Sequence, residues 1–352
     1  MLRRGRPPAP EAAAEGRARS STFAGASRLP RAWTAARLLD LHGLLLLTRA
    51  LDERQSILTR QGRQGIHLSA RGHEASGAGS ALALDPARDI LVPSHRSLAA
   101  VLAWGISPAE VLLQCLSKAS DPASGGRSMP DHYGHRARRV LSMSSPIGTQ
   151  LPHAAGAALA SVTRGQDAVV LAFFGDGASS KADFHEALNF AAIRRLPVVF
   201  VCENNGWSIS VPVGRQMAIR SLAERAAGYG VAGAVVDGTD PLAVHRVVGA
   251  AAARARAGAG PSLIEARVVR LAPHSSDDDD ARYRPPDERA RADRRDPLPR
   301  FARRLRRWGV LDERAEIGLV ELARRRVDEA LAQAEAAAEP EPATALLHLY
   351  AS

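Results

Sequence analysis

The sequence has 352 residues, of which 45% are hydrophobic, and this is enough apolar material for one large domain or two. No apolar run approaches the roughly 20 residues of a membrane span, and the only two cysteines, Cys115 and Cys202, give neither a disulfide framework nor a zinc spacing. The net charge of +10 is carried almost entirely by arginine.

Much of the basic charge lies in residues 1–37 and 282–307. Neither stretch interleaves its arginines with aromatic or groove-reading residues, as the basic face of a nucleic-acid binder does. We therefore expect neither nucleic acid nor a membrane as a partner. A non-catalytic or nucleic-acid-binding relative stays open as the alternative class.

Residues 1–32 are rich in Pro, Ala and Arg without periodicity, which predicts a disordered basic tail. Because the tail is poor in acids, it fits either a bacterial tail or an organelle transit peptide. The first reading places the protein in the bacterial cytoplasm, and the second places it in the mitochondrial matrix.

From residue 33 onward the pattern predicts one α/β domain that extends to residue 352. Residues 33–62 repeat leucines at helical spacing. From about 66 to 270, short apolar runs alternate with amphipathic stretches, which is typical of a parallel sheet flanked by helices. A loop at 270–300 and a helical region at 301–336 follow, so helical extensions are expected at both ends.

The stretch FFGDGASS places Asp176 between two glycines, directly after the buried-strand pattern Ala168–Phe174. A helical segment, Ala182–Arg195, leads to a second apolar run, Leu196–Cys202, which ends in ENNGW. A strand–helix–strand unit of this kind brings Asp176 and the pair Asn204–Asn205 to the same edge of the sheet. Open α/β sheets bind their ligands at that edge.

Carboxylate, amide and main-chain oxygens are hard ligands, and three of them leave half an octahedron open for Mg²⁺ to hold phosphates. Gly175 and Gly177 allow the backbone to approach a diphosphate, and the N-terminus of the following helix favours an anion. A lone GDG is weak evidence. GDG followed after 26 residues by NN, with strand and helix patterns in the expected places, is strong evidence.

This spacing resembles the thiamine diphosphate signature. Over about residues 35–350 the chain is similar to the alpha subunit of 2-oxo acid dehydrogenases, the decarboxylating first component of large complexes. The stretches that carry the resemblance are VPSHRSLAAVLAWG, SMPDHYG, SSPIGTQLPHAAGAALA, DFHEALNFAA, CENNGWSISVP and RLAPHSSDDDDARYR. The PHSSDDDD form resembles the branched-chain type, with pyruvate and acetoin dehydrogenases as alternatives.

The resemblance implies a thiamine diphosphate-binding fold and a set of site residues. It assigns Mg²⁺ to Asp176, Asn205 and the main-chain carbonyl of Trp207, and it assigns the active-site histidine to His274. It assigns cofactor contacts to His95, Arg96, Ser145, Ile147, Gly175, Gly177, Ala178 and Arg270. It also implies a monovalent-cation (K⁺) site at Ser144, Pro146, Thr149 and Gln150.

Three positions depart from the family pattern. His95 stands where the family usually has tyrosine, and Lys181 and Ala182 replace an acid or amide followed by glycine.

The resemblance implies decarboxylation of a 2-oxo acid such as 2-oxoisovalerate, with acyl transfer to a lipoyl group on an acyltransferase. It also implies a beta subunit in an α₂β₂ heterotetramer, because no second α/β unit follows in this chain to complete the cofactor site.

Overall fold

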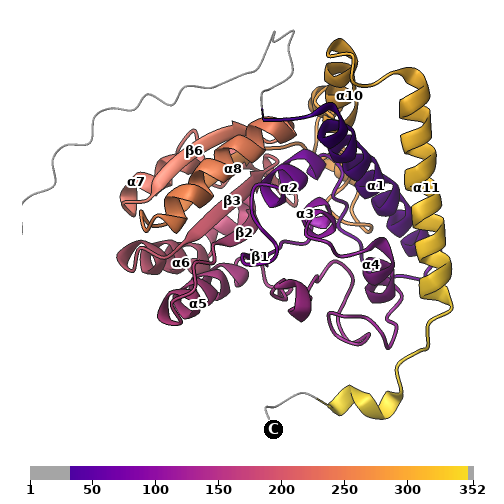
Figure 1. The fold of residues 1–352 in the computed structure, drawn as a ribbon, viewed down its shortest axis with the longest axis horizontal. Coiled ribbons are helices and arrows are strands. Elements are labelled where there is room, and N and C mark those ends of the chain that lie inside the picture. Colours follow the sequence, from indigo (N-terminus) through magenta and orange to yellow (C-terminus); the bar gives the residue numbers. More distant parts are fainter. Residues whose placement is uncertain (1–31, 348–352) are drawn as a thin grey trace, which may run out of the picture.

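The computed structural model describes residues 32–347 and consists of a five-stranded parallel sheet with helices on both faces (Figure 1). The strand order is β1-β2-β3-β7-β6, and every neighbouring pair is parallel. The predicted α/β fold with a parallel sheet is confirmed. The predicted disorder of the tail falls on residues that lie, except for Ala32, outside the described part of the chain.

The strands of the sheet are β1 (Ile90–Val92), β2 (Val170–Gly175), β3 (Val198–Asn204), β6 (Ala232–Asp237) and β7 (Ser262–Arg267). A small antiparallel ribbon pairs β4 (Trp207–Ser208) with β5 (Val211–Pro212). The helices are α1 (Ala35–Arg60), α2 (Glu74–Ala81), α3 (Leu98–Ala103), α4 (Pro108–Cys115), α5 (Gln150–Thr163), α6 (Ala182–Ile193), α7 (Arg225–Gly228), α8 (Pro241–Arg256), α9 (Pro286–Asp293), α10 (Pro297–Arg307) and α11 (Glu313–Glu335). None of the described helices is long and apolar enough to cross a membrane.

The apolar runs of β2 and β3 form the centre of the sheet because both of their faces are covered. Alternate residues of β2, such as Leu171 and Phe173, pack into a core shared with α1, α4, α8 and α11. The intervening residues, such as Ala172 and Phe174, pack into a second core with α5 and α6. Burial on both faces explains why these strands read as continuous apolar runs in the sequence.

Helix α2 is buried along its whole length because it is built from small residues. A Cβ on Gly77 would lie 3.0 Å from the backbone nitrogen of Ala100 on α3, and a Cβ on Gly79 would lie 2.5 Å from the carbonyl oxygen of Pro241 at the start of α8. The two glycines therefore allow three helices to pack at short distance behind the sheet.

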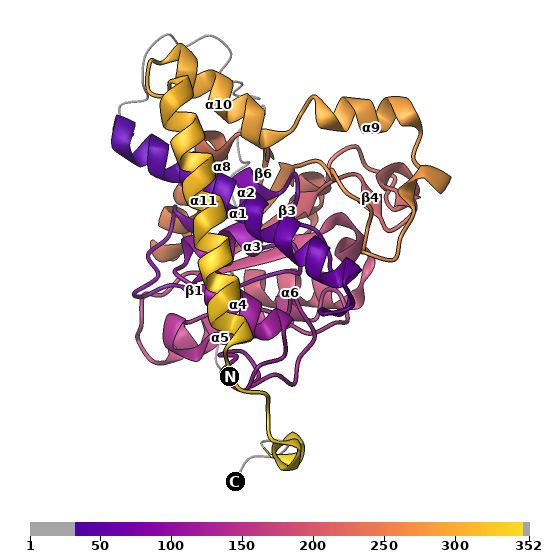
Figure 2. The ribbon, with the colours of Figure 1, turned by 90° about the vertical axis from the view of Figure 1, so that its right-hand side faces the viewer.

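The predicted helical region at 301–336 is divided into α10 and α11 by a turn in which Gly309 has a φ of +68°. Helix α11 lies along α1 (Figure 2), where Arg63 pairs with Glu335 at 2.7 Å. The predicted loop at 270–300 contains α9, which the sequence analysis missed. The residues of α9 are so polar that they show no periodic apolar pattern. The helix is supported by Pro286 in its first turn and by an ion pair between Asp287 and Arg291.

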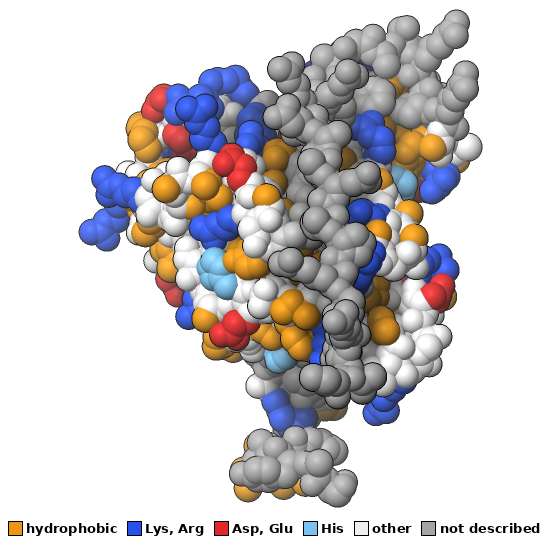
Figure 3. Space-filling model, turned by 90° about the vertical axis from the view of Figure 1, so that its left-hand side faces the viewer, with side chains coloured by type: hydrophobic (Ala, Val, Ile, Leu, Met, Phe, Trp, Pro, Cys, Tyr) orange, Lys and Arg blue, Asp and Glu red, His pale blue; other side chains and the backbone are white. Residues whose placement is uncertain are grey.

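Many arginines of the chain are paired with acids. Arg256 reaches the buried carboxylate of Asp89 at 2.8 Å, and Arg49 reaches the buried Glu74 at 2.6 Å. On the face seen in Figure 3, the described basic side chains lie in separate groups among hydrophobic and acidic ones. Part of the arginine excess therefore forms structural ion pairs. Net charge alone says little about the fold.

A buried charge cluster fixes the segment that leads into α2. His67 lies between two carboxylates, 3.3 Å from Asp52 on α1 and 3.1 Å from Asp131. Asp131 has a left-handed backbone (φ +61°), and its carboxylate accepts further hydrogen bonds from the side chain of Gln55 and the backbone of Leu68. This unusual backbone conformation is therefore held by a buried polar network that converges on the carboxylate of Asp131.

The same segment holds two parts of the cavity wall. The carbonyl of Ser69 accepts a hydrogen bond from the guanidinium of Arg96, and the carbonyl of His67 accepts one from the backbone of Ser276 at 3.0 Å. The charge cluster therefore positions Arg96 and residues 274–276 relative to the sheet.

We predict that His67 makes the stability of the protein depend on pH. Burial lowers its pKa, but the nearby carboxylates of Asp131 and Asp52 outweigh burial and raise the pKa from 6.5 to about 10. Because the folded pKa exceeds the unfolded one, the stabilisation is complete below about pH 6.5 and is lost as pH rises toward 10. His67→Gln should cost about 3–5 kcal/mol of unfolding free energy at pH 6, and the gap from wild type should shrink toward pH 10.

Denaturant unfolding of both proteins at pH 6, 8 and 10 measures this gap. His153→Gln, a substitution of an exposed histidine on α5, serves as the control and should leave the free energy unchanged at each pH. A gap that stays constant or grows with pH contradicts a protonated His67.

Candidate active site

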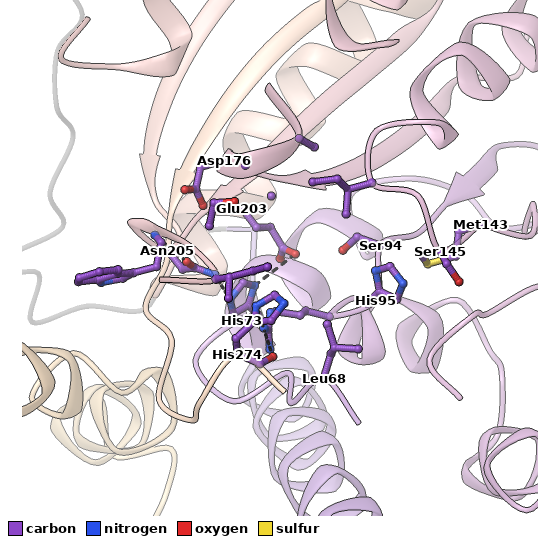
Figure 4. Close-up of a pocket in the computed structure, with 18 of the residues that line it drawn as sticks. Leu68, His73, Ser94, His95, Met143, Ser145, Asp176, Glu203, Asn205 and His274 are labelled. Carbon is purple, nitrogen blue, oxygen red and sulfur yellow. Dashed lines mark hydrogen bonds and ion pairs between the residues drawn. The ribbon is translucent and has the colours of Figure 1, made fainter. Parts of the chain in front are cut away.

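A cavity of about 330 Å³ opens at the carboxyl ends of β2 and β3 (Figure 4). It gathers residues from segments far apart in the sequence, as the strand–helix–strand reading predicts. The following predicted site residues line it: His95, Arg96, Ser145, Ile147, Gln150, Gly175, Asp176, Gly177, Ala178, Asn205, Trp207 and His274. Arg270, Ser144, Pro146 and Thr149 are not among its lining residues.

Asp176 is buried at the end of β2, where it begins a 3₁₀ turn. Its carboxylate accepts a hydrogen bond from Gln216 at 2.9 Å and one from the backbone of Asn205. Burial is the largest effect on its pKa and raises it above the ordinary value, although both hydrogen bonds oppose this. A buried carboxylate with a raised pKa is a strong site for a cation, because the cation restores the charge compensation that water no longer supplies.

The two asparagines after β3 have different surroundings. The amide of Asn204 donates to Glu265 on the neighbouring strand at 2.9 Å, whereas Asn205 lines the cavity. The side-chain oxygen of Asn205 accepts the backbone N–H of Trp207 at 3.1 Å. Asp176, Asn205 and Trp207 therefore lie together at one end of the cavity, and they offer a carboxylate, an amide oxygen and a main-chain carbonyl.

The two glycines around Asp176 have different reasons to lack a side chain. A Cβ on Gly177 would lie 2.3 Å from the hydroxyl of Ser208 on β4, so glycine is needed for the turn to pack against that strand. A Cβ on Gly175 would meet no protein atom within 4 Å, although Gly175 lines the cavity. The open space at Gly175 is a cradle that a ligand can fill, and this fits a diphosphate lying against the backbone.

Arg96 and His274 meet in the wall of the same cavity. The guanidinium of Arg96 donates to the carbonyl oxygen of His274 at 2.6 Å and lies 3.3 Å from its ring nitrogen Nδ1. Because arginine can only donate, Nδ1 must be the acceptor, and the ring proton of His274 lies on Nε2. Burial and the charges of Arg96 and Arg270 lower the pKa of His274 to about 4, so the ring is neutral at pH 7.

Arg270 holds the loop after β7 and does not line the cavity. Its guanidinium donates to the carbonyl oxygen of Ile209 and to the hydroxyl of Tyr283, at 2.9 and 2.8 Å. Tyr283 in turn donates to Asp278, whose carboxylate accepts the backbone N–H of His274 at 2.7 Å. The predicted cofactor contact of Arg270 thus stays a prediction, while its hydrogen bonds show a role in ordering residues 274–283.

The residues predicted to hold a monovalent cation form a turn before α5. The hydroxyl of Thr149 contacts the hydroxyl of Ser144 and donates to the carbonyl of Pro146 at 3.0 Å. Gln150 turns inward and donates to the carbonyl of Phe173 on β2 at 3.0 Å. These contacts bring Ser144, Pro146 and Thr149 together, whereas the side chain of Gln150 is bonded to β2, and the cation itself stays a prediction.

His95, whose identity departs from the family pattern, lies edge-on to His132 with ring centroids 4.9 Å apart. Burial, together with His132, lowers the pKa of His95 to about 4, so it is a neutral hydrogen-bonding group in the site. His132 also contacts the hydroxyl of Ser145 at 2.7 Å, which links two predicted contacts through a residue that the sequence analysis missed.

Other lining residues were missed as well. The polar ones are Ser94, His132, Ser208 and the pair His73 and Glu203, and the apolar ones are Ile66, Leu68, Met129, Met143 and Ile209. His73 lies 130 positions before Glu203, so no local spacing connects them. The only available signal was Glu203 itself, an acid placed at the end of an apolar strand directly before the asparagine pair.

Comparison with known proteins identifies the family of this chain. The model of the family "Dehydrogenase E1 component" matches residues 42–343. The chain belongs to this family. Membership implies thiamine diphosphate as the cofactor, and this fits the acid, the amide and the open glycine cradle of the cavity.

Individual relatives cover most of the chain. It is 42% identical over 313 residues to the 2-oxoisovalerate dehydrogenase subunit alpha of Bacillus subtilis, which spans 89% of this chain and 95% of that protein. It is 43% identical over 276 residues to the 3-methyl-2-oxobutanoate dehydrogenase subunit alpha of Mycobacterium tuberculosis, covering 78% and 72%. The mitochondrial 2-oxoisovalerate dehydrogenase subunit alpha of Bos taurus is 37% identical over 316 residues, covering 89% and 69%. The alpha-subunit names imply a beta-subunit partner.

Proposed function

We propose that this chain is the alpha subunit of a branched-chain 2-oxo acid dehydrogenase that decarboxylates 2-oxoisovalerate and related acids. The observation that carries the proposal is that Asp176, Asn205 and Trp207 line one cavity together with Arg96 and a neutral His274. The names of the relatives support the branched-chain substrate over pyruvate or acetoin.

In this proposal the carboxylate of Asp176, the amide oxygen of Asn205 and the carbonyl oxygen of Trp207 hold Mg²⁺. When bound, thiamine diphosphate supplies the carbanion that attacks the substrate carbonyl and the electron sink for the loss of carbon dioxide. The backbone at Gly175, Gly177 and Ala178 accommodates the diphosphate. Asp176 thus compensates the metal charge on one side while the metal compensates the phosphate charge on the other.

Arg96 and His274 supply hydrogen-bond donors to the ligands. Arg96 uses two of its donor groups on Ser69 and His274, and the remaining N–H groups of a guanidinium suit a phosphate oxygen. His274 carries its proton on Nε2, because Nδ1 faces Arg96, so it can donate that proton to an oxygen of the substrate. In this proposal Ile147 and Ser145 would contact the thiamine ring when the cofactor is bound, and the turn before α5 would hold K⁺.

Exposed residues around the cavity support the proposal that a second chain shares the cofactor. Three apolar lining residues are unusually exposed, namely Met129 at 51%, Ile147 at 45% and Ile209 at 54%. Exposed apolar groups around a site mark a surface that another molecule covers. The beta subunit covers them in an α₂β₂ heterotetramer and supplies the carboxylate that activates the cofactor. The acyl group then passes to a lipoyl-bearing acyltransferase, and the bacterial relatives favour a cytoplasmic location.

We predict that Asp176→Ala removes Mg²⁺-dependent binding of thiamine diphosphate. The substitution deletes the charged metal ligand, so the affinity should fall by more than about 100-fold, beyond the range typical of residues behind the ligands. Calorimetry on the complex co-expressed with its beta subunit measures the affinity. Asp167→Ala, at an exposed ion-paired aspartate, is the control and should bind as wild type does. Unchanged affinity in Asp176→Ala refutes the metal assignment.

We also predict that the chain alone is inactive. Within the described residues there is a single parallel sheet, so the activating carboxylate must come from the partner. The test assays the purified chain, with and without its beta subunit, for decarboxylation of 2-oxoisovalerate and pyruvate and for oxidation of acetoin, with an artificial electron acceptor. Activity is expected only with the beta subunit and mainly with 2-oxoisovalerate. Turnover by the single chain contradicts the two-chain site, and a preference for pyruvate or acetoin contradicts the substrate class.

A further inference from the structure

Two buried side chains next to the proposed metal ligands have no role in the mechanism given so far. Glu203 is the one acid of β3 and His73 precedes α2, and both are about 98–99% buried. The Nδ1 atom of His73 lies 3.4 Å from a carboxylate oxygen of Glu203, which forms no other ion pair among the described residues. A buried carboxylate with one weak partner lowers the stability of the fold, so we looked for a role that explains its presence.

The hydrogen-bond donors and acceptors of this group determine one arrangement. The Nε2 atom of His73 lies 3.3 Å from the amide nitrogen of Asn205 (Figure 4). The amide oxygen of Asn205 accepts the backbone N–H of Trp207, so the atom that faces His73 must be the NH₂ group. Since that group only donates, Nε2 of His73 is the acceptor and its ring proton lies on Nδ1, toward Glu203.

This arrangement links a carboxylate, a histidine and an amide in one direction. The carboxylate of Glu203 favours the proton on Nδ1 of His73, and the unprotonated Nε2 then accepts from the NH₂ group of Asn205. The amide oxygen is left facing the backbone N–H of Trp207. A rotated amide would place NH₂ there instead, and a donor cannot coordinate a metal ion.

We infer that His73, held by Glu203, is a positioning residue that keeps the oxygen of Asn205 turned toward Mg²⁺. This inference rests on the proposed function, because it concerns the same metal. The carboxylate oxygens of Glu203 are buried and have no hydrogen-bond partner in the described chain, and the nearest titratable group is His73, so we assign Glu203 an action through His73. Groups behind the ligands of a metal site orient the ligands in this way and typically alter metal affinity by about 10–100-fold.

The experiment titrates Mg²⁺ into the co-expressed complex at saturating thiamine diphosphate and measures the metal affinity by calorimetry. His73→Phe keeps a ring but has no acceptor, so the affinity should fall by about 10–100-fold. His73→Gln has a side-chain oxygen that can accept from Asn205, and its affinity should stay within about threefold of wild type. His153→Phe, at an exposed histidine of α5, is the matched control and should bind as wild type does.

Glu203→Leu provides a second test, because it removes the acceptor toward which Nδ1 of His73 points. Without that acceptor the ring proton is free to move to Nε2, where it would oppose the NH₂ group of Asn205. The Mg²⁺ affinity should therefore fall in the same direction as in His73→Phe. If His73→Phe fails to assemble with its partner, the contrast between Glu203→Leu and His73→Gln decides the question alone.

Two results overturn the inference: wild-type Mg²⁺ affinity in His73→Phe or in Glu203→Leu, or equal loss in His73→Gln and His73→Phe. The second result would mean that the shape of His73, rather than its acceptor, matters. The Asp176→Ala variant separates this inference from the proposed function. If wild type itself shows no Mg²⁺-dependent cofactor binding, the proposed function fails. If wild type binds, Asp176→Ala does not and His73→Phe does, only the positioning role fails.

Discussion

The burial of one carboxylate, that of Asp176, governs the design of the site. Among the described residues no arginine or lysine forms an ion pair with it, and its hydrogen bonds come from uncharged groups. Burying a charge without a charged partner is expensive, so the carboxylate is fully compensated only when a cation binds. The parallel sheet makes this possible, because β2 and β3 are neighbouring buried strands that end at the same edge. Asn205 therefore lies next to Asp176.

Arg96 is a buried cation in the wall of the same cavity. Burial, and to a lesser extent the charge of Arg270, lower its pKa to about 10 although three carboxylates oppose this. An anion would stabilise the charge of Arg96, as a cation would stabilise that of Asp176. A metal diphosphate supplies both charges in one ligand, which explains the two groups together. The cluster of His67, Asp52 and Asp131 keeps Arg96 in place by holding Ser69 beside it.

The parts of the site that follow local rules could be predicted from the sequence. The apolar runs and the helix between them determine which strands are neighbours, so the order of elements along the chain is enough to place Asp176 and Asn205 at one edge of the sheet. Strand β6 was missed because it contains Gly233 and several partly exposed residues, so it lacks the continuous apolar run of a buried strand. Helix α9 was missed because its contacts are ionic. The assignment of Arg270 to the cofactor followed from resemblance, and the structure places its guanidinium on Tyr283 and Ile209.

The pairing of His73 with Glu203 was beyond sequence reasoning for a different reason. It depends on how α2 packs behind the sheet, which the small residues of that helix determine through close contacts with α3 and α8. Spacing along the chain carries no trace of such contacts. Long-range polar pairs of this kind are therefore visible only once the helices are packed against the sheet.

The most direct measurement is a crystal structure of the complex with thiamine diphosphate and Mn²⁺ in place of Mg²⁺, with anomalous scattering used to locate the metal. The metal peak should lie within coordination distance, about 2.0–2.3 Å, of the carboxylate of Asp176, the side-chain oxygen of Asn205 and the carbonyl oxygen of Trp207. A metal peak elsewhere, or a diphosphate bound away from Gly175 and Gly177 without metal, would contradict the central claim.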